Sequence, residues 1–328
     1  MRLSYRVGSA ALLILAFILI KRHLDSLQND SHVQSFWQFS NVVGGGAAEP
    51  TATPVATPVA TPDSKAEKPQ EKADTAVAET IPIKQTYEIT PIIVPNDRVI
   101  VMAKLSHEDT SWVSTDLNEW RNFIYTVDDV NAARHTPKNK GRESLAYLQY
   151  IVDHYHDLPS MMVFLHPHKD GWEAGWHTDT MEYSNVESVR SLKTEFVQQS
   201  GFVNLRCQGT PGCPDEIHPL EDPPQPGREN GRAYAKAWEE LHNNTNIPEV
   251  VGAPCCSQFA VSKTQVLKRP LSDYQRYYNW VLTNKLPDQL TAWIMEYSWH
   301  IIFGKDPVFC PDIYQCYQDV YGAPDFWS

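Results

Sequence analysis

RVIVMAKL, residues Arg98–Leu105, is the stretch that decides the fold. It is apolar, rich in β-branched residues and of strand length, and it ends in a polar cluster. Asn122–Val127 (NFIYTV) and Met161–Leu165 (MMVFL) have the same character. Between them, Glu143–Tyr155 places its apolar side chains on one helical face. Strands that alternate with helices in this way predict right-handed crossovers and a parallel sheet.

The region that follows continues the alternation. We expect strands at Phe202–Arg206 (FVNLR) and Gln258–Val261 (QFAV), and helices at Tyr274–Leu282 and Leu290–Phe303. The predicted fold class is therefore α/β, with a mostly parallel central sheet and flanking helices in one domain. This is a Rossmann-type arrangement, similar to the GT-A sheet of glycosyltransferases.

The composition changes along the chain and predicts four regions. Residues 1–6 are a short cytoplasmic tail, residues 7–20 (VGSAALLILAFILI) an uncleaved signal anchor, and residues 21–86 a disordered stem with the repeat TATPVATPVATP. Residues 87–328 contain all six Cys and form the lumenal domain. A cleaved signal peptide is the alternative for residues 7–20, because the run is short for a membrane span. The layout predicts a single-pass type II protein of the Golgi or endoplasmic reticulum membrane.

Charge and sequons narrow the class of protein further. The formal net charge of -12 argues against a nucleic-acid partner, because such binding needs a basic face. The Pro/Thr repeat is typical of an O-glycosylated stalk or of an unmodified linker. Asn29 and Asn243 begin N-glycosylation sequons, which a lumenal chain can use.

The cysteines predict disulfides, because an even number of them lies in a domain expected in an oxidising compartment. Many pairings are compatible with the sequence, and the two close-spaced pairs could each close a small loop. Zinc is the competing interpretation of clustered cysteines, but the chain has no C-x-x-C. The six residues are Cys207, Cys213, Cys255, Cys256, Cys310 and Cys316.

Polar or ionisable residues follow each of the first three predicted strands. Because the carboxyl ends of parallel strands meet at one edge of a sheet, we expect a ligand site there. Polar loops without a function are the plainer alternative. The residues are His107, Glu108 and Asp109 after the first strand, Asp128 and Asp129 after the second, and His166 and His168 after the third.

Seven sequence blocks follow one another through the globular region. They are EDTSW (108–112), NKGRE (139–143), VFLHPH (163–168), GWH (175–177), VNLRC (203–207), EVVGAPCCSQFAV (249–261) and MEYSWHIIFG (295–304). In this order they closely resemble the fungal family catalogued as domain of unknown function 3431, from about Val99 to Cys316. The family name implies no activity. Family members have Gly where this chain has Pro167, which would stiffen the loop that contains His168.

The leading hypothesis is a glycosyltransferase-like enzyme that transfers a sugar from a nucleotide-sugar donor to a glycan or protein acceptor. An anchor, a stem and a lumenal α/β domain form the layout of Golgi glycosyltransferases, which is an analogy of architecture. GT-A enzymes hold a divalent ion with an acidic D-x-D at the third strand end, where this chain has His166-Pro167-His168. Imidazoles at this spacing can chelate Mn or Zn but are poor ligands for Mg.

The hypothesis gives roles to further residues. The third metal ligand is His177 or His300, and Glu296 is the base that deprotonates an acceptor hydroxyl. Glu296 and His300 stand four apart in one predicted helix, so both side chains project from the same face. A buried structural pair is the plainer interpretation of these two residues. The residues assigned to nucleotide and diphosphate are His107, Glu108, Asp109, Asp128, Asp129, Lys140 and Arg142.

Two other classes stay open at this point. A metal-dependent lumenal hydrolase would use the same histidines to activate water. A non-catalytic lumenal helper would need none of them, and the domain would then be a binding scaffold.

Overall fold

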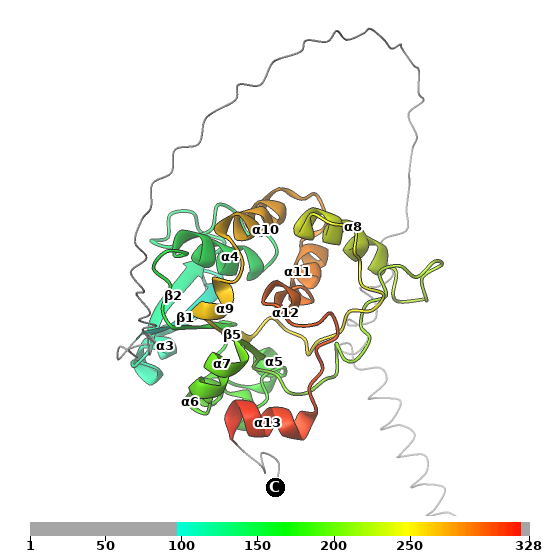
Figure 1. The fold of residues 1–328 in the computed structure, drawn as a ribbon. Helices are drawn as coiled ribbons and strands as arrows, with labels where there is room; N and C mark the ends of the chain where they lie inside the picture. Colours follow the sequence, from blue (N-terminus) through cyan, green and yellow to red (C-terminus); the bar gives the residue numbers. More distant parts are fainter. Residues whose placement is uncertain (1–96, 323–328) are drawn as a thin grey trace, which may run out of the picture. The chain divides into compact units, whose positions relative to one another are not determined.

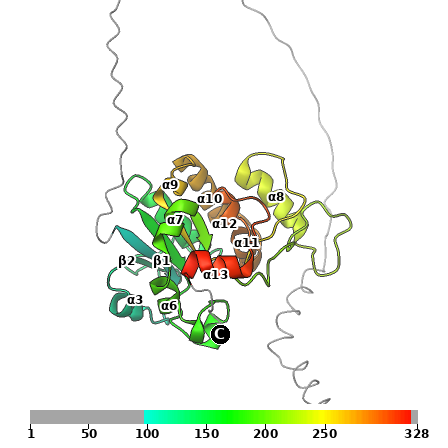
Figure 2. The ribbon, with the colours of Figure 1, turned by 60° about the horizontal axis from the view of Figure 1, so that its bottom comes forward.

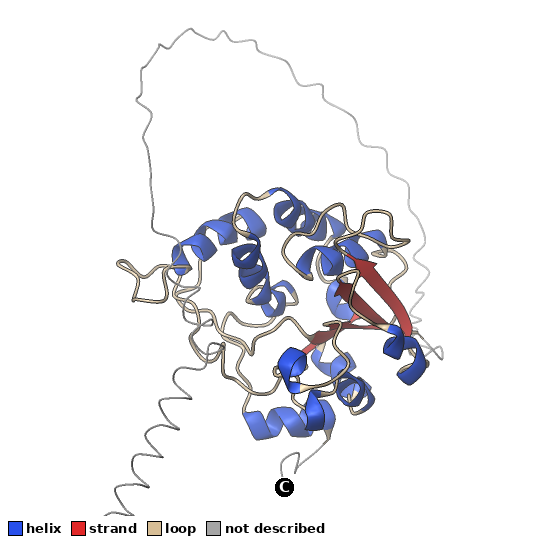
Figure 3. Cartoon of the chain, turned by 180° about the vertical axis from the view of Figure 1, so that it is seen from behind, coloured by secondary structure: helices blue, strands red, loops and turns tan. Residues whose placement is uncertain are grey.

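The computed structural model describes residues 97–322 of the chain. Within this range, a five-stranded sheet lies between two layers of helices (Figures 1 and 3). The strands run across the sheet in the order β2-β1-β3-β5-β4. They are β1 (Arg98–Lys104), β2 (Arg121–Thr126), β3 (Met161–Leu165), β4 (Phe202–Asn204) and β5 (Phe259–Ser262).

The helices differ in length, and several have only one turn. Those between the strands are α3 (Ser111–Asp116), α4 (Ser144–Asp153), α5 (Trp172–Gly175), the 3-10 turn η1 (Met181–Tyr183), α6 (Asn185–Arg190), α7 (Thr194–Ser200) and α8 (Gly231–His242). Those after β5 are α9 (Lys263–Val266), α10 (Leu271–Thr283), α11 (Asp288–Glu296), α12 (Trp299–Ile302) and α13 (Ile313–Tyr321).

The predicted cytoplasmic tail, signal anchor and stem (1–86), together with the sequon at Asn29, lie outside the described residues. None of the helices between residues 97 and 322 combines the length and the apolar character that crossing a membrane requires. Asn243, which begins the second sequon, is exposed at the end of α8, where its backbone is left-handed with a φ of 52°.

The predicted mostly parallel, Rossmann-type sheet of the GT-A kind is wrong. β1 is parallel to β2 and β3, but β5 runs antiparallel to both of its neighbours, β3 and β4. Every residue of β5 is buried, so the strand is an apolar run without alternation, and such a run does not reveal its direction. The sheet is therefore mixed, and β2, β1 and β3 form its parallel half.

Alternate residues of the strands face opposite helix layers. On one side, Val99 and Val101 of β1 share a core with Phe164 of β3 and with buried residues of α4, α8, α10, α11 and α12. On the other side, Ile100 and Met102 pack against residues of α3, α6, α7 and α13. Figure 2 shows α13 beside α7 on this second side. Because both faces of the sheet are covered, the strands need apolar side chains in both directions, and this explains their unbroken apolar sequences.

The predicted continuous helix over Leu290–Phe303 is also wrong. α11 ends at Glu296 and α12 begins only at Trp299. The hydroxyl of Ser298, between the two helices, donates a hydrogen bond of 2.6 Å to the carbonyl of Ile294. A side chain that bonds to the backbone in this way competes with helix continuation. Ser298 is itself buried, so the pattern of buried positions continues across the break and conceals it.

All six predicted cysteines are in disulfides, and of the pairings that the sequence left open, the structure has long-range bonds in place of two small loops. Cys207 bonds to Cys316 and Cys213 bonds to Cys310, across sequence separations of 109 and 97 residues. The segment after β4 and the segment that leads into α13 are therefore joined side by side, with the first cysteine of one linked to the last of the other.

A core substitution tests the packing around β3. Phe164 is fully buried, and its ring centroid lies 4.8 Å from those of Tyr147 and Phe259. We expect Phe164→Ala to lower the free energy of unfolding by about 3–5 kcal/mol, because it leaves a cavity between aromatic rings. Urea unfolding of the disulfide-intact chain measures this, with the exposed Val130→Ala as the control. A loss below about 1 kcal/mol would contradict the described core.

The disulfide pairing can be read directly by mass spectrometry. The Cα atoms of the long-range pairs lie 5.6 and 5.9 Å apart, within the normal reach of a disulfide. Proteolysis of the non-reduced chain should therefore yield the peptide with Cys207 linked to that with Cys316, and likewise Cys213 linked to Cys310. Recovery of a Cys207–Cys213 loop would refute the arrangement.

Candidate functional site

A cavity of about 580 Å³ lies at the edge of the sheet where β1 and β3 end. Lys104, the last residue of β1, and His166, the first residue after β3, both line it. The start of α4 and the short α5 complete the wall. The charged and polar residues that line the cavity are Lys104, Glu108, Asp109, Asn139, Arg142, Glu143, His166, His168 and Asp288.

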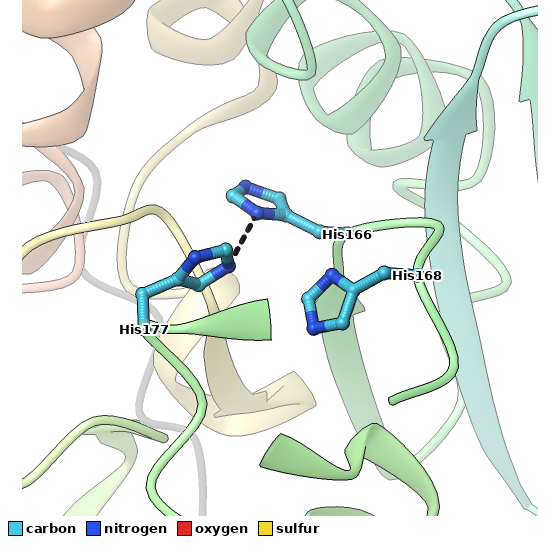
Figure 4. A group of neighbouring side chains, drawn as sticks. All are labelled: His166, His168 and His177. Atoms are coloured by element: carbon cyan, nitrogen blue, oxygen red, sulfur yellow. Dashed lines mark hydrogen bonds between the residues drawn. The ribbon is translucent and has the colours of Figure 1, made fainter. Parts of the chain in front are cut away.

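Three histidines form a compact cluster beside the cavity (Figure 4). His166 and His168 follow β3, and His177 lies just beyond α5. Nδ1 of His166 lies 2.8 Å from Nε2 of His177, and one nitrogen from each of the three rings lies within 4.8 Å of the others. The predicted trio of metal ligands is thus brought together by two separate turns of the chain.

Buried hydrogen bonds fix the backbone of this cluster. The side-chain amide of Asn185 donates to the carbonyls of His168, at 2.9 Å, and His166, at 3.3 Å. The side-chain carbonyl of Gln258 accepts from the N–H of His166 at 2.9 Å. The amide of Gln258 also donates to the hydroxyl of Thr178 at 3.1 Å. Asn185 and Gln258 are almost fully buried, so the cluster is held by a rigid and largely dry polar network.

The imidazoles are kept neutral by their surroundings. Burial lowers the pKa of His168 to about 4 and that of His177 to about 3, and it lowers the pKa of His166 well below its usual range. The neighbouring histidines contribute to the lowered pKa of His166 and of His177. Each ring therefore keeps one lone pair at neutral pH, which is the state that binds metal ions.

Glu143 is a site residue that sequence reasoning did not single out. It precedes the first residue of α4, its Oε2 lies 3.9 Å from Nε2 of His166, and its side chain is 13% exposed. Burial raises its pKa. The NKGRE block contains Glu143, but only its basic residues were assigned a role. The signal that could have identified it is an acidic residue at the start of a helix whose next residues are all buried.

Glu296 lies close to Glu143 and Arg142, although it does not itself line the cavity. Its Oε1 accepts a hydrogen bond of 2.8 Å from the N–H of Cys256. The pKa of Glu296 is raised to about 7, mainly by burial and also by the charges of Glu143 and Glu216, while the Cys256 N–H and Arg142 act in the opposite direction. A carboxyl group with this pKa can exchange a proton near neutral pH.

The segment Cys255–Gln258 connects the two halves of the site. Cys255 and Cys256 are joined by a disulfide, so their sulfurs are not thiolate ligands. Cys256 and Ser257 both have left-handed backbones, with φ of 90° and 53°. Non-glycine residues in this region are held there by their surroundings and concentrate at functional sites. Cys256 holds Glu296, and Gln258 holds His166.

The structure separates the remaining predicted site residues into two groups. Glu108, Asp109 and Arg142 line the cavity, as do His166 and His168. Within residues 97–322, the other predicted nucleotide contacts are not part of its lining. The residues in this second group are His107, Asp128, Asp129 and Lys140.

Local hydrogen bonds account for most of these displaced side chains. Asp128 accepts from the N–H and the hydroxyl of Ser106, and Lys140 donates to the carbonyl of Leu286 at 2.5 Å.

His300 is 1% exposed, and its Nε2 lies 3.0 Å from the carbonyl oxygen of Pro307. Burial lowers the pKa of His300 to about 4. The described contact of the His300 side chain is therefore with the backbone near Pro307.

Comparison with known proteins gives a family and no activity. A family model described as "Protein of unknown function (DUF3431)" matches residues 100–319. No curated protein and no solved structure matches the chain.

The pKa of Glu296 predicts a specific pH dependence. The folded chain holds this proton more tightly than the unfolded chain, in which the ordinary pKa is 4.5. The resulting stability is complete below that value and is lost as the pH rises through about 7. Glu296→Gln cannot ionise, so we expect its stability relative to the natural chain to increase between about pH 5 and about pH 8.

Urea unfolding midpoints at the two pH values measure this difference. Glu173→Gln is the control, because Glu173 is exposed on α5. An equal difference between Glu296→Gln and the natural chain at both pH values would show that Glu296 is ionised throughout.

Proposed function

Because the chain belongs to the DUF3431 family, whose description names no activity, we propose its function from the site: it is a glycosyltransferase that moves a sugar from a nucleotide-sugar donor to an acceptor hydroxyl. The observation that supports this most directly is the cavity at the ends of β1 and β3. In open α/β sheets, nucleotide ligands bind at the carboxyl ends of parallel strands. A volume of about 580 Å³ is also within the usual range for small-molecule sites.

The charges of the cavity support a phosphorylated donor. Arg142 lines it with an exposed side chain, and the guanidinium group can bind phosphate oxygens in pairs. Lys104 lines the same cavity and donates to the carbonyl of Glu108 at 2.6 Å. Both cations would offset the charge that develops on the departing nucleoside diphosphate. Glu108 and Asp109, near Lys104, are suited to accept hydrogen bonds from ribose or sugar hydroxyls.

Glu143 and Glu296 would provide the base that takes the proton from the acceptor hydroxyl. As the acceptor oxygen bonds to the anomeric carbon, the bond from that carbon to the diphosphate oxygen breaks. The hydroxyl proton then passes to a carboxylate. Glu143 lines the cavity, and Glu296 lies close behind it in electrostatic contact. Raised pKa values in both groups favour a carboxylate that takes up a proton and keeps it.

A divalent ion, Mn or another, would assist the leaving group if the histidine cluster holds one. We also place the domain in the lumen of the secretory pathway, as part of a type II membrane protein of the Golgi or the endoplasmic reticulum. Three disulfides and the absence of a free cysteine among the described residues support an oxidising compartment.

A metal-dependent hydrolase is the second candidate, and one observation favours it. The cluster offers three nitrogen ligands with Glu143 next to them. Sites with three protein ligands and an open position bind and activate water, and a nearby carboxylate can take its proton.

Sugar-nucleotide binding tests the transferase. We expect one of a panel of uridine and guanosine diphosphate sugars to raise the melting temperature of the full chain. At about 100 times its Kd, a ligand stabilises the folded state by about 2.7 kcal/mol. Arg142→Ala should reduce this stabilisation strongly, because it removes the phosphate contact. Arg232→Ala is the matched control, because Arg232 is exposed on α8.

The rate of sugar transfer is the measurement that decides whether the chain is a transferase. With the donor that binds, Glu143→Gln should lower kcat by at least about 100-fold while donor binding persists. Absence of stabilisation by any nucleotide sugar, with Mn present and absent, would exclude the transferase. Release of free sugar or phosphate by the metal-loaded chain without an acceptor would favour the hydrolase.

A further inference from the structure

We propose that His166, His168 and His177 form a mononuclear site for a zinc-class transition-metal ion, and that Glu143 orients His166 from behind. The ion site would serve transfer and hydrolysis alike, because it depends on the ligands and not on the reaction. Figure 4 shows the three rings turned toward a common space from two sides. Ring contacts between all three pairs, with centroids 4.8 to 6.3 Å apart, make this a packed group of imidazoles.

The hydrogen bonds of Thr178 determine the tautomer of His168. The Thr178 hydroxyl donates its single proton to the side-chain oxygen of Asn185 at 3.2 Å. It accepts from the amide of Gln258, so toward Nε2 of His168, at 3.1 Å, it can only accept again. His168 therefore has its proton on Nε2, and the lone pair of its neutral ring is on Nδ1. A hydrogen bond that fixes the tautomer of a ligand in this way is typical of metal sites.

His166 and His177 face each other through nitrogen atoms. At 2.8 Å, Nδ1 of His166 and Nε2 of His177 share one proton, which one ring donates to the other. An ion that binds both atoms needs two lone pairs, so the shared proton must move to the far nitrogen of the ring that holds it. In His166 that far nitrogen, Nε2, is buried and has no hydrogen-bond partner.

Glu143 is placed to accept a hydrogen bond from the N–H that would form on Nε2 of His166. Its Oε2 lies 3.9 Å from Nε2 of His166, somewhat beyond hydrogen-bond distance. With an ion on Nδ1, the N–H at Nε2 would point at a carboxylate and complete a carboxylate–histidine–metal arrangement. With the ion bound, the buried Nε2 of His166 would thus gain a hydrogen-bond partner, which is the nearby carboxylate of Glu143.

The type of ligand selects the ion. Three imidazoles suit zinc, cobalt, nickel or copper, whereas Mg and Ca need oxygen ligands. Nitrogens at about 2.0–2.1 Å from tetrahedral zinc are roughly 3.3 Å apart, so the widest separation in the cluster must shorten. His168 is the ring that must move, because the other two nitrogens are already close. Gly175 lets this ring lie where it does, since a Cβ there would lie 2.9 Å from Cδ2 of His168.

The test measures metal alone on the full chain, produced without a polyhistidine tag and freed of metal with a chelator. We expect one zinc per chain by elemental analysis after dialysis against zinc and then buffer. Cobalt in place of zinc should give the visible absorption of tetrahedral coordination, and Mg should not compete. His168→Ala and His177→Ala should weaken zinc binding at least about 100-fold, and Glu143→Gln about 10-fold. His156→Ala, at an exposed histidine after α4, should leave it unchanged.

Several outcomes would overturn the site. The first is that neither zinc nor cobalt binds stoichiometrically. The second is that His168→Ala and the natural chain bind zinc equally well. The third is that the chain binds Mn but not zinc. If the histidine variants fail to fold, two measurements still test the metal site. They are the cobalt spectrum of the natural chain and the zinc affinity of Glu143→Gln. Nucleotide-sugar stabilisation of the metal-free chain reports on the transferase separately, so failure of one proposal is distinguishable from failure of the other.

Discussion

The structure depends on the hydrogen bonding of β3 along both of its edges. β3 pairs in parallel with β1 and antiparallel with β5, and all five of its residues are buried. The direction and height at which the chain leaves the sheet are therefore fixed by the strand pairing. His166 is the first residue beyond this strand, and its N–H bonds to Gln258, the residue before β5. The strand pairing of the core thus continues directly into the site.

Much of the fold follows from apolar runs that any reader of the sequence can find. Predicted and observed bounds coincide for β3, and they differ by one residue at one end of β1 and at both ends of β2. This agreement arises because a buried strand needs an unbroken apolar sequence. The direction of β5 was not predictable, since its residues are buried on both faces and read alike in either sense. The crossed disulfides depend on how two distant segments lie side by side, which local spacing does not encode.

The site was predictable only where strand ends determine position. His166 and His168 are bound to β3, and they reach the cavity as expected. Asp128 and Asp129 follow an edge strand, where nothing beyond that strand compels the loop to turn inward. Glu143 owes its place to the start of α4 against the end of β3, and the sequence indicates this tertiary contact only through an acidic residue at a helix start. Burial shifts the pKa of Glu143 upward and that of His166 downward, because it disfavours the charged form of each group.

The two long disulfides have a consequence for the integrity of the chain. Between Cys213 and Cys310 the polypeptide passes through the exposed stretch 221–230, a natural place for a protease to cut. A single cleavage there would release nothing, because each fragment remains covalently attached to the other at two points. On a non-reducing gel the nicked protein would migrate as one species, and it would separate into two fragments only after a reductant is added. β5 and α13 would keep their places in the fold. A break in this stretch would therefore leave both parts of the domain covalently joined.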